Sequence, residues 1–263
     1  MNAPPPVQPA KVNGGVSNAA WMLALLCLIL AIMDGIAGLF AGIGYRIDLW
    51  SYRDGIGALR YVFWLATGTA GAAALAMILG AISGRPGALV AGFIALLIAG
   101  TTAYIPWNLR EAVRRVPPIH DISTDTVNPP QFSRVATLRK TTDHSLAYDG
   151  PEVAALQKKG YPDIGPIMLQ APAEKVFDVA KSVLLSMGLL LLEADRAQGR
   201  LEATETSLLF GFEDDVVVRI SSLPDGATRV DIRSKSRVGR SDLGINAARI
   251  RLFAASMRKK LDL

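Results

Sequence analysis

The chain has 263 residues, of which 51% are hydrophobic, and a formal net charge of +5. This length allows one or two domains, and such a high apolar content is unusual for a purely soluble protein. The basic residues are not interleaved with aromatic ones, so we predict no nucleic-acid partner. The single cysteine, Cys27, excludes a disulfide framework.

The first part of the sequence predicts a disordered tail, residues 1–18, followed by a three-span transmembrane domain, residues 19–107. Residues 19–44, 61–82 and 87–107 are apolar and each long enough to cross a bilayer. The proline-rich, weakly basic tail and the length of the first segment favour a retained span over a cleaved signal peptide.

Small residues recur at helical spacing in these segments. The four residues 83–86 between the second and third segments force an antiparallel hairpin. Rows of glycine and alanine allow helices to approach closely in lipid, and we expect them to pack either within the chain or between copies. The residues in these rows are Gly38 and Gly42 in the first segment and Ala91, Ala95 and Ala99 in the third.

Asp34 is the only charged residue in the three apolar segments. An ionisable residue in a span is a candidate functional group, for a proton or a polar ligand. The second and third segments contain no lysine, arginine or histidine to pair with it. We therefore expect Asp34 to have a structural role, either near one end of a long, offset span or protonated and hydrogen-bonded to a neighbouring backbone group.

Positive charges near the spans predict the orientation of the chain. Two of them, Lys11 and Arg85, fall on one side of the membrane. Six fall on the other side, together with the C-terminal domain: Arg46, Arg53, Arg60, Arg110, Arg114 and Arg115. This count favours a cytoplasmic C-terminal domain.

Residues 108–165 form a proline-rich linker or wrapping segment, mostly irregular, with two helical turns expected at residues 152–159. His120 and His144 are the only histidines, and each has an aspartate beside it. A metal site needs three or four converging ligands, which this pattern does not supply. We predict neither a metal nor a cofactor.

Residues 166–263 predict an α+β domain, in which an antiparallel sheet packs with two helices. The expected helices cover residues 171–188 and 241–261, and the strands cover 167–170, 189–195, 199–208, 214–222 and 228–238. Helical spacing predicts a buried face on each helix: Val176, Phe177, Ala180, Val183, Leu184 and Met187 on the first, and Leu243, Ala247, Ile250, Phe253 and Met257 on the second. In the last strand, Val230 and Ile232 face one side. The charged residues Arg229, Asp231, Arg233, Lys235 and Arg237 face the other.

In the C-terminal third, an aspartate-led strand is followed by a serine- and arginine-rich run. Its characteristic residues are Asp215, Arg233, Ser234, Ser236, Arg237, Gly239, Ser241, Asp242, Gly244, Asn246, Arg249 and Ile250. In these residues the C-terminal third resembles the domain of unknown function 1499 family. The cysteine-bearing segment of many members is absent here, where the chain reads "DISTDTVNPPQF". The family has no established activity. Similar domains often follow export signals, which implies an extracytoplasmic domain and opposes the arginine count.

The same run is a candidate anion site. Arg233, Arg237, Arg240 and Arg249 supply charge, Gly239 allows close approach, and Ser241 and Asn246 supply polar groups at the start of a helix. The competing interpretation is structural, with Asp242 as the helix cap and the arginines in ion pairs. The sequence favours this structural interpretation.

No catalytic motif is present, and we lean away from an enzyme. We predict an integral protein of the plasma membrane, of the bacterial inner-membrane type, with a non-enzymatic binding or accessory module at the bilayer surface. Its expected partners are the lipid bilayer and either an anionic phospholipid or a membrane protein. One alternative is an enzyme on a membrane-derived substrate that uses Asp215 or Glu213 with Arg233 and Arg237. Another is a subunit of a larger membrane complex.

Overall fold

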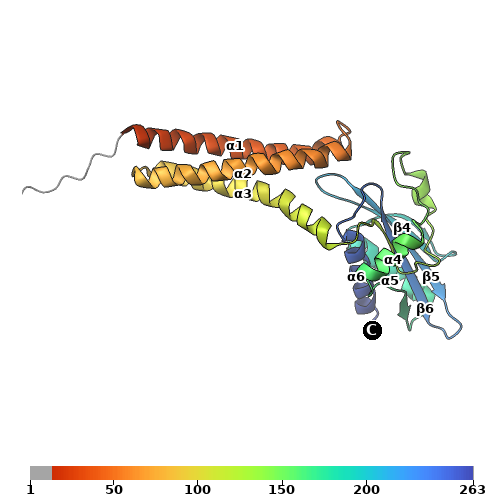
Figure 1. Ribbon diagram of the computed structural model, residues 1–263. Coiled ribbons are helices and arrows are strands. Elements are labelled where there is room, and N and C mark those ends of the chain that lie inside the picture. The colour runs from red at the N-terminus through yellow and green to blue at the C-terminus, as the bar shows by residue number, and fades with distance from the viewer. Residues whose placement is uncertain (1–13, 263) are drawn as a thin grey trace, which may run out of the picture. The chain divides into compact units, whose positions relative to one another are not determined.

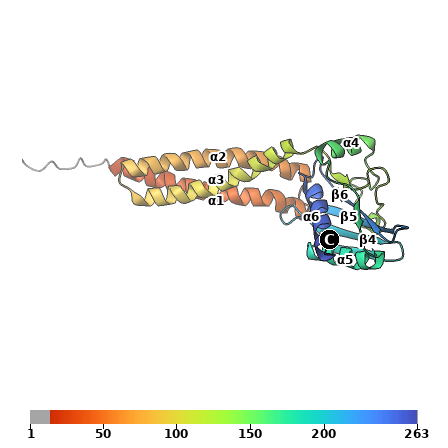
Figure 2. The same cartoon turned by 90° about the horizontal axis from the view of Figure 1, so that it is seen from below.

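The computed structural model describes residues 14–262 and divides into two compact units, Met1–Arg110 and Glu111–Leu263. The first unit consists of helices α1 (Gly14–Arg46), α2 (Tyr52–Ile82) and most of α3 (Pro86–Arg115). The three helices lie side by side (Figures 1 and 2). Each is long and apolar enough to cross a membrane. Most of the tail predicted at residues 1–18 lies outside the described residues, and α1 begins within it, at Gly14.

Small side chains form the interior of the helical unit. One buried cluster joins Ala24 of α1, Ala76 of α2 and Ala91 of α3, and a second joins Ala31, Ala73 and Ala95 together with Cys27 and Ala99. Large apolar residues such as Leu26, Ile36 and Leu65 point outwards instead. This inside-out pattern is typical of helices that pack in lipid. The alanine row of α3 therefore packs within the chain, and the alternative of packing between copies is wrong for this row.

The second unit contains a six-stranded antiparallel sheet. Five strands lie in the order β1-β6-β5-β4-β3. The short strands β1 and β2 both pair with the same edge of β6, β1 near its C-terminal end and β2 near its N-terminal end. Their bounds are β1 Asp121–Ser123, β2 Ile167–Leu169, β3 Leu190–Asp195, β4 Arg200–Thr206, β5 Glu213–Ser222 and β6 Thr228–Ser236. The predicted α+β class is confirmed.

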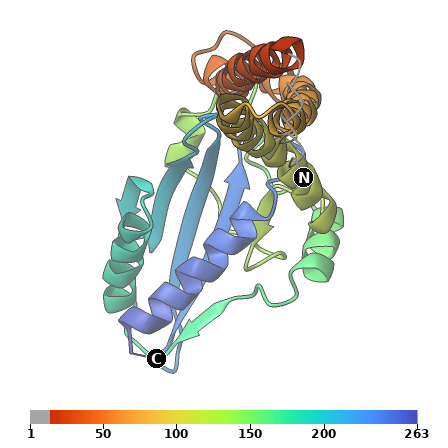
Figure 3. The same cartoon turned by 90° about the vertical axis from the view of Figure 1, so that its left-hand side faces the viewer.

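Helices α5 (Ala173–Ser186) and α6 (Ile245–Lys260) cover one face of this sheet (Figure 3). Val176, Phe177 and Val183 of α5 and Ile250 and Phe253 of α6 are buried against alternate residues of the strands. These are the apolar positions that helical spacing assigned to the core. The opposite face of the sheet carries the charged side chains of β6 (Thr228–Ser236).

Two predicted boundaries are corrected by the structure. The segment 108–165 is more regular than expected, because α3 runs to Arg115, β1 joins the sheet, and the short 3-10 helix η1 (Arg134–Thr137) follows. Helix α4 (Pro151–Gly160) lies where two helical turns were expected. Helix α6 begins at Ile245 rather than at residue 241. Leu243 and Gly244 have φ angles of 59° and 81°, which a right-handed helix excludes.

Candidate functional site

The charged face of β6 is the most unusual feature of the second unit, because it is buried. Arg233 has no exposed surface, and its guanidinium donates two hydrogen bonds of 2.8 and 2.7 Å to the equally buried carboxylate of Asp121 on β1. The rings of Phe132 and Tyr148 lie on it, with centroids at 5.1 and 5.4 Å. Two hydrogen bonds in parallel and two aromatic faces suit a guanidinium better than an ammonium.

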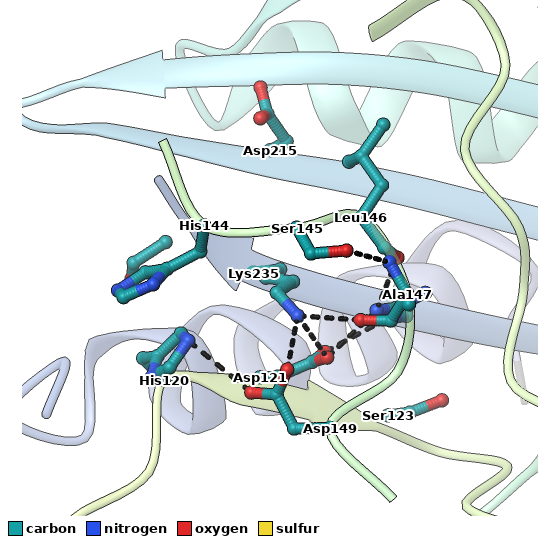
Figure 4. Close-up of polar contacts among 12 residues, drawn as sticks. His120, Asp121, Ser123, His144, Ser145, Leu146, Ala147, Asp149, Asp215 and Lys235 are labelled. Atoms are coloured by element: carbon teal, nitrogen blue, oxygen red, sulfur yellow. Dashed lines mark hydrogen bonds and ion pairs between the residues drawn. The ribbon is translucent and has the colours of Figure 1, made fainter. Parts of the chain in front are cut away.

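Lys235, two residues further along β6, is also fully buried. Its ammonium lies 3.0 Å from Asp121, 2.7 Å from Asp149 and 2.8 Å from the carbonyl oxygen of Ala147 (Figure 4). Three acceptors match the three hydrogens of the ammonium group. Lys235 therefore attaches the segment that ends at Asp149 to the sheet.

Asp215 on β5 is the centre of a second ion cluster. Its carboxylate accepts hydrogen bonds from Arg237 at 2.9 and 3.0 Å, from Arg139 at 2.8 Å and from Thr204 at 2.6 Å. Burial disfavours the charge of Arg237, but the hydrogen bonds and charge of Asp215, together with Glu213, outweigh it and raise the pKa of Arg237. Asp215 is buried, and each of its two carboxylate oxygens accepts two hydrogen bonds.

On the helical face of the sheet, Arg249 of α6 forms a third cluster. It donates to Asp214 at 2.7 Å and to Glu205 at 2.8 Å. Beside it, the side chain of Asn246 accepts from Ser234 at 2.6 Å and donates to Ser236 at 3.0 Å. Arg249 and Asn246 therefore fasten α6 to β5 and β6.

The loop between β6 and α6 presents few free polar groups. Asp242 accepts the backbone N–H groups of Gly244 at 2.9 Å and Asn246 at 2.8 Å, so it occupies the start of α6. Ser241 accepts from the N–H of Leu243. Gly239 has a φ angle of 94°, and its carbonyl oxygen lies 3.0 Å from a ring nitrogen of His144. Arg240 is exposed and has no ion pair among the described residues.

The structure thus separates the residues of the predicted anion site. Arg233, Arg237 and Arg249 belong to three different ion clusters and are neutralised by carboxylates, and only Arg240 retains an unpaired charge. The acidic cap Asp242 repels an anion at the start of α6.

The sequence patterns did not identify Asp121, Arg139, Asp149 and Lys235 as members of the buried ion clusters. Lys235 was placed on the correct strand face, but its partner Asp121 is 114 positions earlier in the printed sequence. The signal was the presence of four aspartates in residues 121–149, irregularly spaced, together with the cations on one face of β6. Pairing them required the β1–β6 contact.

His120 and His144 lie together at the edge of these clusters. Their rings are stacked, with centroids 4.0 Å apart and planes inclined by 22°. His120 Nε2 lies 3.3 Å from a carboxylate oxygen of Asp149, and the contact lacks the alignment of a hydrogen bond. Within residues 14–262, no group of three or more histidine, cysteine, aspartate or glutamate side chains is arranged to hold a metal.

Asp34 has a partner in the helical unit. Its carboxylate is almost fully buried and accepts a hydrogen bond of 2.8 Å from the hydroxyl of Thr69 on α2. The sequence placed the hydrogen bond of Asp34 on neighbouring backbone, whereas its partner in the structure is a side chain of the adjacent helix.

Comparison with known proteins agrees with this architecture. A search of the curated proteins finds no match to the chain. A family model described as "Protein of unknown function (DUF1499)" matches residues 121–257, more than half of the chain. The match begins at the first residue of β1 and ends in α6, so it includes the three ion clusters that hold the sheet together. The chain belongs to the DUF1499 family.

Proposed function

We propose that this protein is a membrane-anchored binding module without catalytic chemistry, and that one edge of its DUF1499 domain binds anionic lipid headgroups. This edge, here called the tethered edge, consists of the β4–β5 loop, residues 207–212, and the β6–α6 loop with the first residue of α6, residues 237–245. Three steps support the proposal.

The first step is the position of these loops relative to the chain that arrives from α3. The end of β4 pairs with the start of β5 at Thr206 and Glu213, and the N–H of Arg237 bonds to the carbonyl of Glu213. The two loops therefore leave the sheet at the same end. The N–H of Asp242 bonds to the carbonyl of Ile119, four residues after α3 ends at Arg115. The tethered edge therefore includes a loop that is bonded to Ile119, in the segment that follows α3 along the chain.

The second step is the chemistry of this edge. Leu208 is 90% exposed and Ile245 is 51% exposed. Arg240 lies in the β6–α6 loop, five positions before Ile245, and is the one arginine of residues 233–249 without a carboxylate partner in residues 14–262. Exposed apolar side chains beside a free cation are typical of contact with a membrane surface. A basic residue near an anionic bilayer contributes about 1 kcal/mol.

The third step concerns the enzyme alternative. Asp215 and Glu213, its proposed acids, are both bound by Arg237, and Asp215 is also held by Arg139. An acid or base in catalysis must reach a substrate atom. The saturated carboxylate of Asp215 favours a scaffold role for this cluster, and with it a binding module.

The test uses the full-length protein in lipid nanodiscs made with a zwitterionic lipid alone or with added phosphatidylglycerol. Nanodiscs leave both faces open, so the test holds for either orientation of the domain. We expect amide hydrogen exchange in residues 207–212 and 237–245 to slow in the anionic discs. Arg240→Gln should remove this difference between the two lipids.

Lys175→Gln is the matched control. Lys175 is an exposed lysine in the first turn of α5, near the β3–β4 turn at the opposite end of the sheet. Its loss should leave the lipid dependence intact. Equal hydrogen exchange of the tethered edge in both kinds of nanodisc would disprove binding of anionic lipid. Equal effects of Arg240→Gln and Lys175→Gln would show a general effect of charge and would contradict a site at this edge.

A further inference from the structure

Residues 138–149, here called the strap, cross the charged face of the sheet and are held there mainly by polar contacts. Arg139 bonds to Asp215, Arg233 bonds to the carbonyl of Leu146 at 3.0 Å, and Lys235 bonds to Asp149. The strap contributes no residue to the buried apolar core of this unit. Its attachment to the sheet therefore depends on charge and hydrogen bonding, which pH can alter.

His144 connects the strap to the β6–α6 loop. Its backbone N–H donates to the carbonyl of Arg237 at 2.7 Å, and its ring Nε2 lies 3.0 Å from the carbonyl oxygen of Gly239. A carbonyl oxygen only accepts, so Nε2 of His144 carries the hydrogen in this contact. Both contacts are made to the loop that presents Arg240.

His120 faces this connection from the other side, on the residue before β1. Its side chain is 15% exposed, and its ring is stacked on that of His144 at 4.0 Å (Figure 4). The buried Nε2 atom makes no hydrogen bond. A proton added at His120 would therefore enter a nearly closed site that has no aligned acceptor.

The charged groups around His120 act in opposite directions. The carboxylates of Asp149 on the strap and Asp121 on β1 favour its protonation, whereas His144 on the strap and Lys235 on β6 oppose it. Burial is the largest influence and also opposes it, so the pKa of His120 is lowered from its ordinary value of 6.5. The folded state binds this proton less tightly than an open state does, and acid favours the open state.

We propose that His120 and His144 form an acid-sensitive clasp, in which protonation of His120 releases His144 from the β6–α6 loop and opens the strap. Movement of the strap takes the facing imidazole away and gives the His120 ring access to water. The clasp is closed above the ordinary pKa of histidine and opens progressively as the pH falls below it. The proposal does not depend on lipid binding.

The experiment measures amide hydrogen exchange of the full-length protein, corrected for the intrinsic rate. Between about pH 7.5 and about pH 5.5, one linked proton should increase opening at the His144 amide roughly three- to tenfold. Amides of α5 (Ala173–Ser186), which lies on the opposite face of the sheet, serve as the internal reference and should not change.

His120→Gln keeps a polar side chain but cannot take up the proton, and it should abolish the pH dependence at the His144 amide. His144→Gln preserves a donor for the carbonyl of Gly239 and should weaken the dependence, because the facing imidazole is lost. An unchanged pH response in His120→Gln would overturn the proposal. The proposal would also be overturned if hydrogen exchange at the His144 amide of the wild-type protein did not change with pH. Protonation of His120 would then not open the strap.

Discussion

The guanidinium of Arg233 and the carboxylate of Asp121 form a doubly hydrogen-bonded ion pair without exposed surface, although 112 residues separate them in the chain. Lys235 shares the same carboxylate at 3.0 Å. One acid thus neutralises much of the charge of two buried cations, and it links the segment after α3 to the strand at the centre of the family run.

Asp121→Asn is expected to be strongly destabilising. It leaves Arg233 buried without its full counter-charge, and loss of one partner of a buried ion pair costs about 3–5 kcal/mol. Urea unfolding of the second unit should be followed by circular dichroism, because the four tryptophans all lie in residues 21–107. Asp178→Asn is the control: Asp178 pairs with Arg196 at an exposed site and should change stability little. Equal effects of both substitutions would contradict the role of burial.

The sheet and its helical layer could be predicted well from the sequence because they follow local patterns. Alternation on β6 placed Val230 and Ile232 towards the helices, and helical spacing placed Phe253 and Met257 in the core. The pattern of charges on β6 was read correctly as one face. Its burial was not predictable, because it depends on Asp121 and Asp149, which tertiary contacts bring from a segment that looked like a linker.

The candidate site shows the same division. The sequence identified Asp242 as a possible cap, and its carboxylate accepts the N–H of Gly244, just before α6, and that of Asn246 in the first turn. The sequence favoured ion pairs for the arginines but also offered a single anion site made of four of them. Arg233, Arg237 and Arg249 are instead divided among three clusters, because strand alternation sends the first two to one face and α6 holds the third on the other. Residue spacing alone does not supply those counter-charges.

Replacement of Asp242 should separate its hydrogen bonds from its charge. Asp242→Asn removes the charge but keeps one oxygen as an acceptor for the N–H groups of Gly244 and Asn246. Asp242→Ala removes both the charge and the acceptors. The alanine variant should be less stable than the asparagine variant by about 1 kcal/mol, the usual contribution of a helix cap. Urea unfolding of both variants under the same conditions provides the comparison, and equal stabilities would rule out a capping role.

The charge of Asp242 gives a separate pH prediction. Burial raises the pKa of Asp242 above its ordinary 3.8, against the lowering effect of the N–H groups of Gly244 and Asn246. The folded state therefore holds this proton more tightly than the unfolded chain. Its stabilising contribution is complete below pH 3.8 and is lost as the pH rises through the folded pKa. Asp242→Asn should remove this component from the pH dependence of the free energy of unfolding, which urea titrations at a series of pH values measure.

Two glycines with left-handed backbone offer a test of close packing. Gly199 and Gly226 have φ angles of 60° and 82°. A Cβ atom at position 199 would lie 2.3 Å from the carbonyl oxygen of Ile220, whereas one at position 226 meets nothing within 4 Å. Gly226→Ala should cost about 1–2 kcal/mol from backbone strain alone. Gly199→Ala should cost at least about 1 kcal/mol more, because backbone must move. Equal losses in urea unfolding would contradict the contact.

Thr69 allows the environment of Asp34 to be tested in the helical unit. Thr69→Val removes the hydroxyl that donates to Asp34 across the α1–α2 interface but keeps the shape of the side chain. Interhelical hydrogen bonds in membranes contribute about 0.6 kcal/mol on average, and up to about 1.7 kcal/mol. A double-mutant cycle with Asp34→Asn, measured by unfolding in mixed micelles, should give a coupling energy in this range.

Thr67→Val is the matched control for that cycle. The hydroxyl of Thr67 donates to the carbonyl of Phe63 within its own helix at 2.7 Å and faces outwards. Because this hydrogen bond stays within α2, the coupling energy between Thr67→Val and Asp34→Asn should be close to zero. A coupling for Thr69 no larger than that for Thr67 would mean that the hydrogen bond to Asp34 adds nothing to helix packing. A larger coupling for Thr69 would assign the coupling energy to the hydrogen bond, because the valine variant keeps the shape of the side chain and removes only the hydroxyl.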